Sequence, residues 1–79
     1  MQAVEAMVRE AAGGSLPVFE ALVLRFQDMA VGYAYAILGD YSAAQDAAQE
    51  AFIQVYTNLG RLQEPAVFPG WFKRVVFSS

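Results

Sequence analysis

Residues 45–56 read Gln45-Asp-Ala-Ala-Gln-Glu-Ala-Phe-Ile-Gln-Val-Tyr56, and they predict a helix with two distinct faces. Because an α-helix turns by about 100° per residue, Asp46, Gln49 and Glu50 share one face, with Ile53 beside them. The opposite face carries small and apolar side chains, namely Ala44, Ala48, Ala51, Val55, Leu59 and Leu62. We expect this second face to enter a core and the first to form a surface for a partner.

A short helix and a long helix are predicted before this segment. The short helix rests on apolar residues at helical spacing and stops at Gly13-Gly14. Ser15 can cap the long helix, whose first turn tolerates Pro17, and Gly39 can end it in a left-handed conformation. The apolar positions of the long helix are Phe19, Leu22, Val23, Phe26, Ala30, Tyr33, Ala34, Ile37 and Leu38. Their spacing makes this the most strongly patterned helix of the chain.

The remaining boundaries follow from capping and breaking residues. Ser42 and Gln45 have the spacing of a capping box, so we expect the third helix to begin near Ala43. It should end near Leu59-Gly60, and the breakers in residues 61–70 predict a loop of about ten residues. Residues 71–77 suit a strand by propensity, but a single strand would have no partner among helices. We therefore predict a last helix there.

Composition narrows the class of protein. The chain has 79 residues, of which 57% are hydrophobic, which suits one small domain with a core. It contains no cysteine and no histidine, so we expect no disulfide, no metal site and no cofactor. The N-terminus has acidic groups where a signal peptide is basic, and no uncharged run approaches the length of a membrane span. We expect a soluble, cytoplasmic protein.

Charge is distributed unevenly along the chain. The net charge is −3, with two basic and seven acidic side chains up to residue 60. From residue 61 onward, three basic side chains oppose a single acidic one. The C-terminal part is therefore the segment that nucleic acid would favour, although so small an excess is weak evidence alone.

The paired carboxylates of Asp46 and Glu50 raise the question of catalysis. Two acids on one helix face can perform acid and base chemistry when their environments differ. This helix offers no nucleophile, no histidine and no apolar pocket on that face, so we do not expect an enzyme. A merely solvated face is an alternative, but Ile53 at its centre favours a contact surface.

Aromatic and basic residues interleave near the C-terminus. Phe68, Trp71, Phe72 and Phe77 flank Lys73 and Arg74, a composition that can stack on unpaired bases and neutralise phosphates. Aromatic residues in so small a domain also serve as core, and the spacing leaves both interpretations open.

Two motifs in order resemble a known family. Asp46-x-x-Gln49-Glu50-x-Phe52 followed by Phe68-x-x-Trp71-Phe72-x-Arg74-Val75 resembles the second conserved region of bacterial sigma factors, specifically the extracytoplasmic-function group. The segments 19–26 and 38–40 are also similar to that family. The resemblance spans about residues 17–77, and it implies an all-α domain of three principal helices plus a short N-terminal helix.

The resemblance also implies partners. The family docks on the coiled-coil clamp of the RNA polymerase β′ subunit, here through Asp46, Gln49, Glu50 and Ile53, and recognises and melts the promoter −10 element by engaging its non-template strand. The DNA contacts would involve Arg61, Phe68, Trp71, Phe72, Lys73 and Arg74. An anti-sigma factor is a further expected partner. The alternative is a helical protein-interaction domain that binds polymerase or an anti-sigma factor without binding DNA.

Two departures qualify the resemblance. Pro69-Gly70 stands where the family usually has polar or basic residues, which puts the loop geometry in question. We also expect residues 1–79 to be a single domain from a longer protein, without the helix-turn-helix domain that binds the −35 element.

Overall fold

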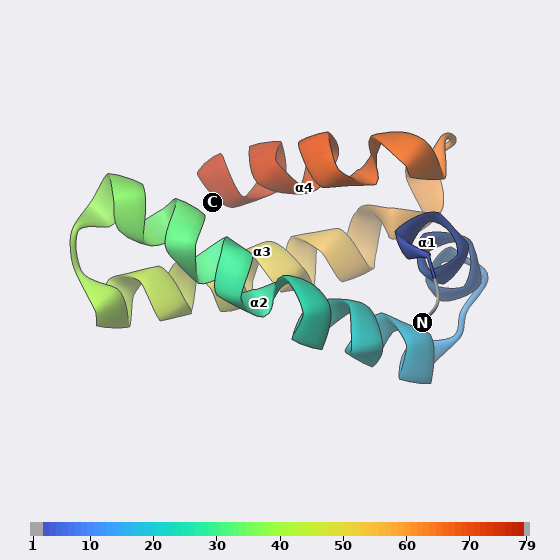
Figure 1. Cartoon of the computed structure of the whole chain (residues 1–79), viewed down its shortest axis with the longest axis horizontal. Helices are drawn as coiled ribbons and strands as arrows, with labels where there is room; N and C mark the ends of the chain where they lie inside the picture. Colours follow the sequence, from blue (N-terminus) through green and yellow to red (C-terminus); the bar gives the residue numbers. More distant parts are fainter. Residues whose placement is uncertain (1–2, 79) are drawn as a thin grey trace.

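The computed structural model describes residues 3–78, and its regular elements are all helical (Figure 1). The four α-helices are α1 (Val4–Ala12), α2 (Leu16–Leu38), α3 (Tyr41–Asn58) and α4 (Phe68–Phe77). Two 3₁₀ turns, η1 (Leu59–Arg61) and η2 (Pro65–Val67), connect α3 to α4. The predicted all-α class is confirmed, and residues 3–78 contain no strand.

The long helices α2 and α3 form an antiparallel hairpin on which the other two helices pack. Figure 1 shows α4 lying along one side of the hairpin. α1 crosses the end of the hairpin opposite the turn between α2 and α3, near the start of α2. α4 contacts both hairpin helices, and α1 contacts α2, η1 and η2. The domain measures 35 × 21 × 18 Å. Its length is that of α2, because α2 is the longest element.

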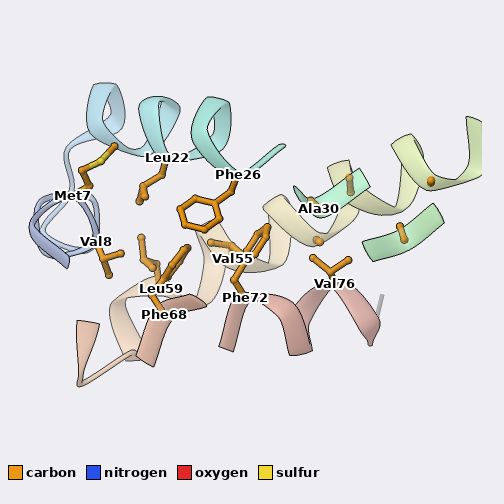
Figure 2. Close-up of a cluster of buried hydrophobic side chains, with 14 residues drawn as sticks. Met7, Val8, Leu22, Phe26, Ala30, Val55, Leu59, Phe68, Phe72 and Val76 are labelled. Atoms are coloured by element: carbon orange, nitrogen blue, oxygen red, sulfur yellow. The ribbon is translucent and has the colours of Figure 1, made fainter. Parts of the chain in front are cut away.

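The core combines alanines with a cluster of aromatic rings (Figure 2). Alanines at the hairpin interface allow the α2 and α3 backbones to approach closely. In the same core the ring of Phe26 in α2 contacts the rings of Phe68 and Phe72 in α4. The centroid of the Phe26 ring is 5.3 Å from the centroid of each of these two rings. The buried hydrophobic residues are Met7, Val8, Leu22, Phe26, Ala30, Ala34, Ala44, Ala48, Ala51, Val55, Leu59, Phe68, Phe72 and Val76.

Both ends of α2 agree with the sequence-based prediction. The Ser15 hydroxyl accepts a hydrogen bond from the Val18 amide at 3.4 Å, and Pro17 occupies the first turn. Gly39 ends the helix with φ of 69°, a conformation that glycine adopts without steric cost.

The start of α3 differs from the prediction. Asp40, and not Ser42, caps this helix, because its Oδ1 accepts a hydrogen bond from the Ala43 amide at 2.9 Å. Asp40 has the extended backbone that a capping residue requires, whereas Ser42 already lies in the first turn. The helix therefore begins at Tyr41, two residues before the expected start.

The predicted loop over residues 61–70 is also shorter than expected. Glu64 caps η2 by accepting from the Ala66 amide at 3.3 Å, and α4 begins at Phe68. Pro69 and Gly70 therefore lie inside the first turn of α4, where a proline costs no helical hydrogen bond. The helical prediction for residues 71–77 is confirmed.

The predicted core face of α2 stops one turn early. Ile37 and Leu38 are 61% and 49% exposed, whereas Ala34 is buried. These two residues lie at the tip of the hairpin, which extends beyond the C-terminal end of α4 (Figure 1). Helical periodicity gives the direction of a face but not the length over which a neighbour covers it.

α2 is also long and apolar enough to cross a membrane, with a mean hydropathy of 1.2. Length and composition do not distinguish such a span from the core helix of a bundle. Here Leu22, Phe26, Ala30 and Ala34 pack inside the domain. These four residues form the core-facing stripe of α2, and 22% of the apolar window is buried inside the domain.

Candidate functional site

The outer face of α3 displays the four residues singled out in the sequence. Asp46, Gln49, Glu50 and Ile53 are all exposed, and they lie opposite the buried alanine stripe of the same helix. Ile53 is 61% exposed, which is high for a large aliphatic side chain. Within residues 3–78, neither the Asp46 nor the Glu50 carboxylate has an ion pair or a hydrogen-bonded side-chain partner. Both are therefore available to a cationic partner.

This outer face borders a shallow groove between α2 and α3. The groove has a volume of about 270 Å³, and Gln49 is shared between it and the outer face. Its lining is Val23, Gln27, Val31, Gln45, Ala48, Gln49 and Phe52. The acidic face is therefore continuous with a partly apolar depression on α2.

The residues expected to bind DNA divide into exposed and buried sets. Arg61, Lys73 and Arg74 are exposed, and Trp71 is half-buried. Phe68 and Phe72, however, are 1% and 0% exposed. Assigning these two rings to DNA stacking was wrong, because each ring packs against Phe26 and neither presents a face to solvent (Figure 2).

Trp71 borders a second groove, between α3 and α4. This groove has a volume of about 520 Å³. Its lining combines apolar and polar side chains from both helices and the connection between them, namely Gln54, Asn58, Arg61, Leu62, Gln63, Glu64, Val67, Trp71 and Val75. An aromatic ring, amides and a guanidinium group thus line the same depression.

Sequence reasoning missed the α3 contribution to this groove. The Asn58 amide donates from Nδ2 to the Gln54 backbone oxygen at 2.9 Å, which holds the Asn58 side chain against the helix. The Oδ1 atom of Asn58 remains available as an acceptor. The only available sequence signal was the i, i+4 spacing of Gln54 and Asn58, which places them together on a flank of α3.

Metal chemistry has no candidate residues in the part of the chain that the structure describes. Residues 3–78 contain no group of three acidic, histidine or cysteine side chains placed to hold a metal ion. The two candidate sites of this domain are the exposed α3 face and the α3–α4 groove.

Comparison with known families agrees with this arrangement. The sigma-70 region 2 model matches residues 22–77, which contain most of α2 and all of α3 and α4. The chain belongs to the sigma-70 region 2 family. The resemblance stated from the two motifs is thereby confirmed.

Curated relatives point in the same direction. The chain is 33% identical over 73 residues to RNA polymerase sigma-H factor of Pseudomonas aeruginosa, covering 92% of this chain and 38% of that protein. It is 34% identical over 65 residues to the probable RNA polymerase sigma factor RfaY of Xanthomonas campestris pv. campestris, covering 82% and 16%. It is 33% identical over 61 residues to ECF RNA polymerase sigma factor SigE of Mycolicibacterium smegmatis, covering 77% and 23%.

The chain thus spans between 16% and 38% of the length of these three relatives. No solved structure matches it significantly.

Proposed function

We propose that this domain is a sigma-factor module that acts in transcription initiation in the cytoplasm. In this proposal α3 holds the RNA polymerase core by its outer face, and the groove beside Trp71 engages the −10 element. Membership of the sigma-70 region 2 family is the observation that carries the proposal. The names of the relatives support it, since all three are RNA polymerase sigma factors.

The outer face of α3 has the chemistry needed for a basic helical partner such as the β′ clamp. Asp46 and Glu50 lie one turn apart, with the Gln49 amide beside them. Arginine side chains on a partner helix can form charge-assisted, bidentate bonds to such carboxylates, which provide orientation as well as affinity. Ile53 adds an apolar contact next to the charges.

Binding to RNA polymerase core enzyme tests this surface. The double variant Asp46→Ala/Glu50→Ala should bind about tenfold more weakly or worse, because two charge-assisted contacts are lost. Glu5→Ala/Asp28→Ala is the matched control, since it removes the same charge from exposed positions on other helices. Fluorescence anisotropy of the labelled chain measures the affinity of both double variants for the core enzyme. Unchanged binding by the α3 variant, with normal folding, contradicts the polymerase surface.

The α3–α4 groove has the chemistry needed for an unstacked base. Extruding a base costs a few kcal/mol of stacking, which contact with an aromatic ring and hydrogen bonds to the base edges can offset. Trp71 supplies the ring, and the side chains of Gln54 and Asn58 supply amide groups. Arg61 lines this groove, and Lys73 and Arg74 are exposed on α4 outside it, where they can neutralise phosphates of a strand that continues across the helix.

A single-stranded −10 oligonucleotide tests the second surface. The chain should bind it weakly, and the affinity should fall as salt rises, because phosphate contacts release counterions. If the chain binds polymerase core but no DNA at low salt, it is a protein-interaction module without DNA binding. An anti-sigma factor would then compete with polymerase for the domain.

A further inference from the structure

The ammonium group of Lys73 lies against two aromatic rings. Its Nζ is 5.3 Å from the centroid of the Tyr33 ring and 5.6 Å from that of the Phe77 ring. Both distances are within the range of about 6 Å in which a cation is attracted to a ring face. Lys73 is exposed, so these rings hold a cation that still reaches solvent.

The two rings come from different helices and together form a fixed contact site for the Lys73 ammonium group. Phe77 lies one turn after Lys73 on α4, whereas Tyr33 comes from α2, beside α4. Their centroids are 5.6 Å apart and their planes are inclined by 51°. Tyr33 is half-buried against the core, and Phe77 follows the buried Val76. Packing of α4 on α2 therefore determines where the ammonium group sits.

We infer that Tyr33 is a positioning residue for a DNA phosphate contact made by Lys73. The inference rests on the proposed DNA-binding role of Lys73 and adds a residue that neither of the two candidate surfaces contains. Together with Phe77, Tyr33 holds the ammonium group in place on the surface of α4 before DNA arrives.

The chemistry of the ammonium group permits both contacts at once. It has three N–H donors and no acceptor, so two ring faces leave a donor free for a phosphate oxygen. A lysine side chain otherwise loses much rotamer freedom when it is immobilised on a ligand. Because the rings restrict that freedom in the unbound domain, less is lost on binding.

Proton NMR of the free domain tests whether the Lys73 side chain lies against the two rings. Lys73 is the only lysine of the chain, so its Hε signals are assigned without ambiguity. Ring currents should shift these protons upfield. Tyr33→Phe should retain the shift, and Tyr33→Leu should reduce it. Phe77→Leu removes the other ring and gives a second measurement if Tyr33→Leu fails to fold. Hε signals at the position of a free lysine in the wild-type chain overturn the inference.

A double-mutant cycle tests the consequence for DNA. Tyr33→Leu should weaken binding of a single-stranded oligonucleotide by about two- to fivefold, because the Lys73 side chain must then be ordered when DNA binds. Tyr33→Phe should restore binding, and Tyr33→Leu should have no further effect in a Lys73→Gln background. Tyr35→Leu is the matched control, because Tyr35 is exposed on the opposite side of α2.

The outcomes separate this inference from the proposed function. If Lys73→Gln weakens binding and Tyr33→Leu does not, the positioning role is overturned while the DNA surface stands. Stronger binding by Tyr33→Leu also overturns it, since the rings would then withhold the ammonium from DNA. If the wild-type chain binds no DNA at low salt, the proposed function fails and this inference fails with it.

Discussion

Phe72 stacks on Phe68 one turn earlier in α4, with ring centroids 5.7 Å apart and planes inclined by 19°. Both rings are buried, whereas Trp71 between them is half-buried and lines the α3–α4 groove. One short helix therefore presents Phe68 and Phe72 to the core and Trp71 to a candidate binding surface. Substitution of a core ring should lower stability, whereas substitution of Trp71 should lower affinity for DNA.

Phe72→Ala should lower the free energy of unfolding by about 3–5 kcal/mol, because it leaves a cavity among Phe26, Phe52 and Phe68. For a domain of this size such a loss is a large fraction of the total stability. Trp71→Ala should cost less stability and should weaken single-stranded DNA binding. Urea denaturation measures the stability of the two variants, and DNA titration measures their affinity for single-stranded DNA. A stable Phe72→Ala variant with impaired DNA binding contradicts the assignment of this ring to the core.

Asp40→Ala should destabilise the domain by about 1 kcal/mol, because the Ala43 amide loses its capping acceptor. Ser42→Ala should change stability by less than about 0.5 kcal/mol, since Ser42 lies within the helix and alanine has the higher helix propensity. Urea midpoints of the two variants provide the comparison. A larger loss for Ser42→Ala would restore the capping box expected from the sequence.

Gly32→Ala should stabilise the domain by about 0.5–1 kcal/mol, because Gly32 lies inside α2 and a Cβ there meets no atom within 4 Å. Gly39→Ala should instead destabilise it by about 1–2 kcal/mol, since φ at this position is 69°. Thermal unfolding should show shifts of opposite sign. Equal shifts in one direction argue against the left-handed end of α2.

Gln54→Ala/Asn58→Ala should weaken binding of the −10 oligonucleotide without changing its salt dependence, because amides contact bases and not phosphates. Arg61→Gln should reduce the slope of log affinity against log salt by about 0.7, the value for one phosphate contact on a single strand. Trp71 is the only tryptophan, so its fluorescence reports binding in each titration. Identical salt slopes for both variants contradict this division between base and phosphate contacts.

Much of the fold was predicted from local patterns in the sequence. The two ends of α2 follow from Ser15 and Gly39, whose preferences act within one turn of chain. The start of α3 was misplaced because Asp40 and Ser42 are both good capping residues, and only the backbone of the folded hairpin selects between them. The early start of α4 was missed because Pro69-Gly70 usually marks a loop, although a proline in the first helical turn is tolerated.

The sequence by itself determined the helices and the exposed face of α3, because periodicity and capping are properties of neighbouring residues. Tertiary structure alone decided that Phe68 and Phe72 are core, that Gln54 and Asn58 share a groove with Trp71, and that Tyr33 meets Lys73. Phe68, Trp71 and Phe72 share an arc of about 100° on α4, so their spacing does not say which of these rings faces the core and leaves the rotation of the helix within that arc undefined. Packing against Phe26 of α2 sets that rotation, and this contact joins residues more than forty positions apart in the chain.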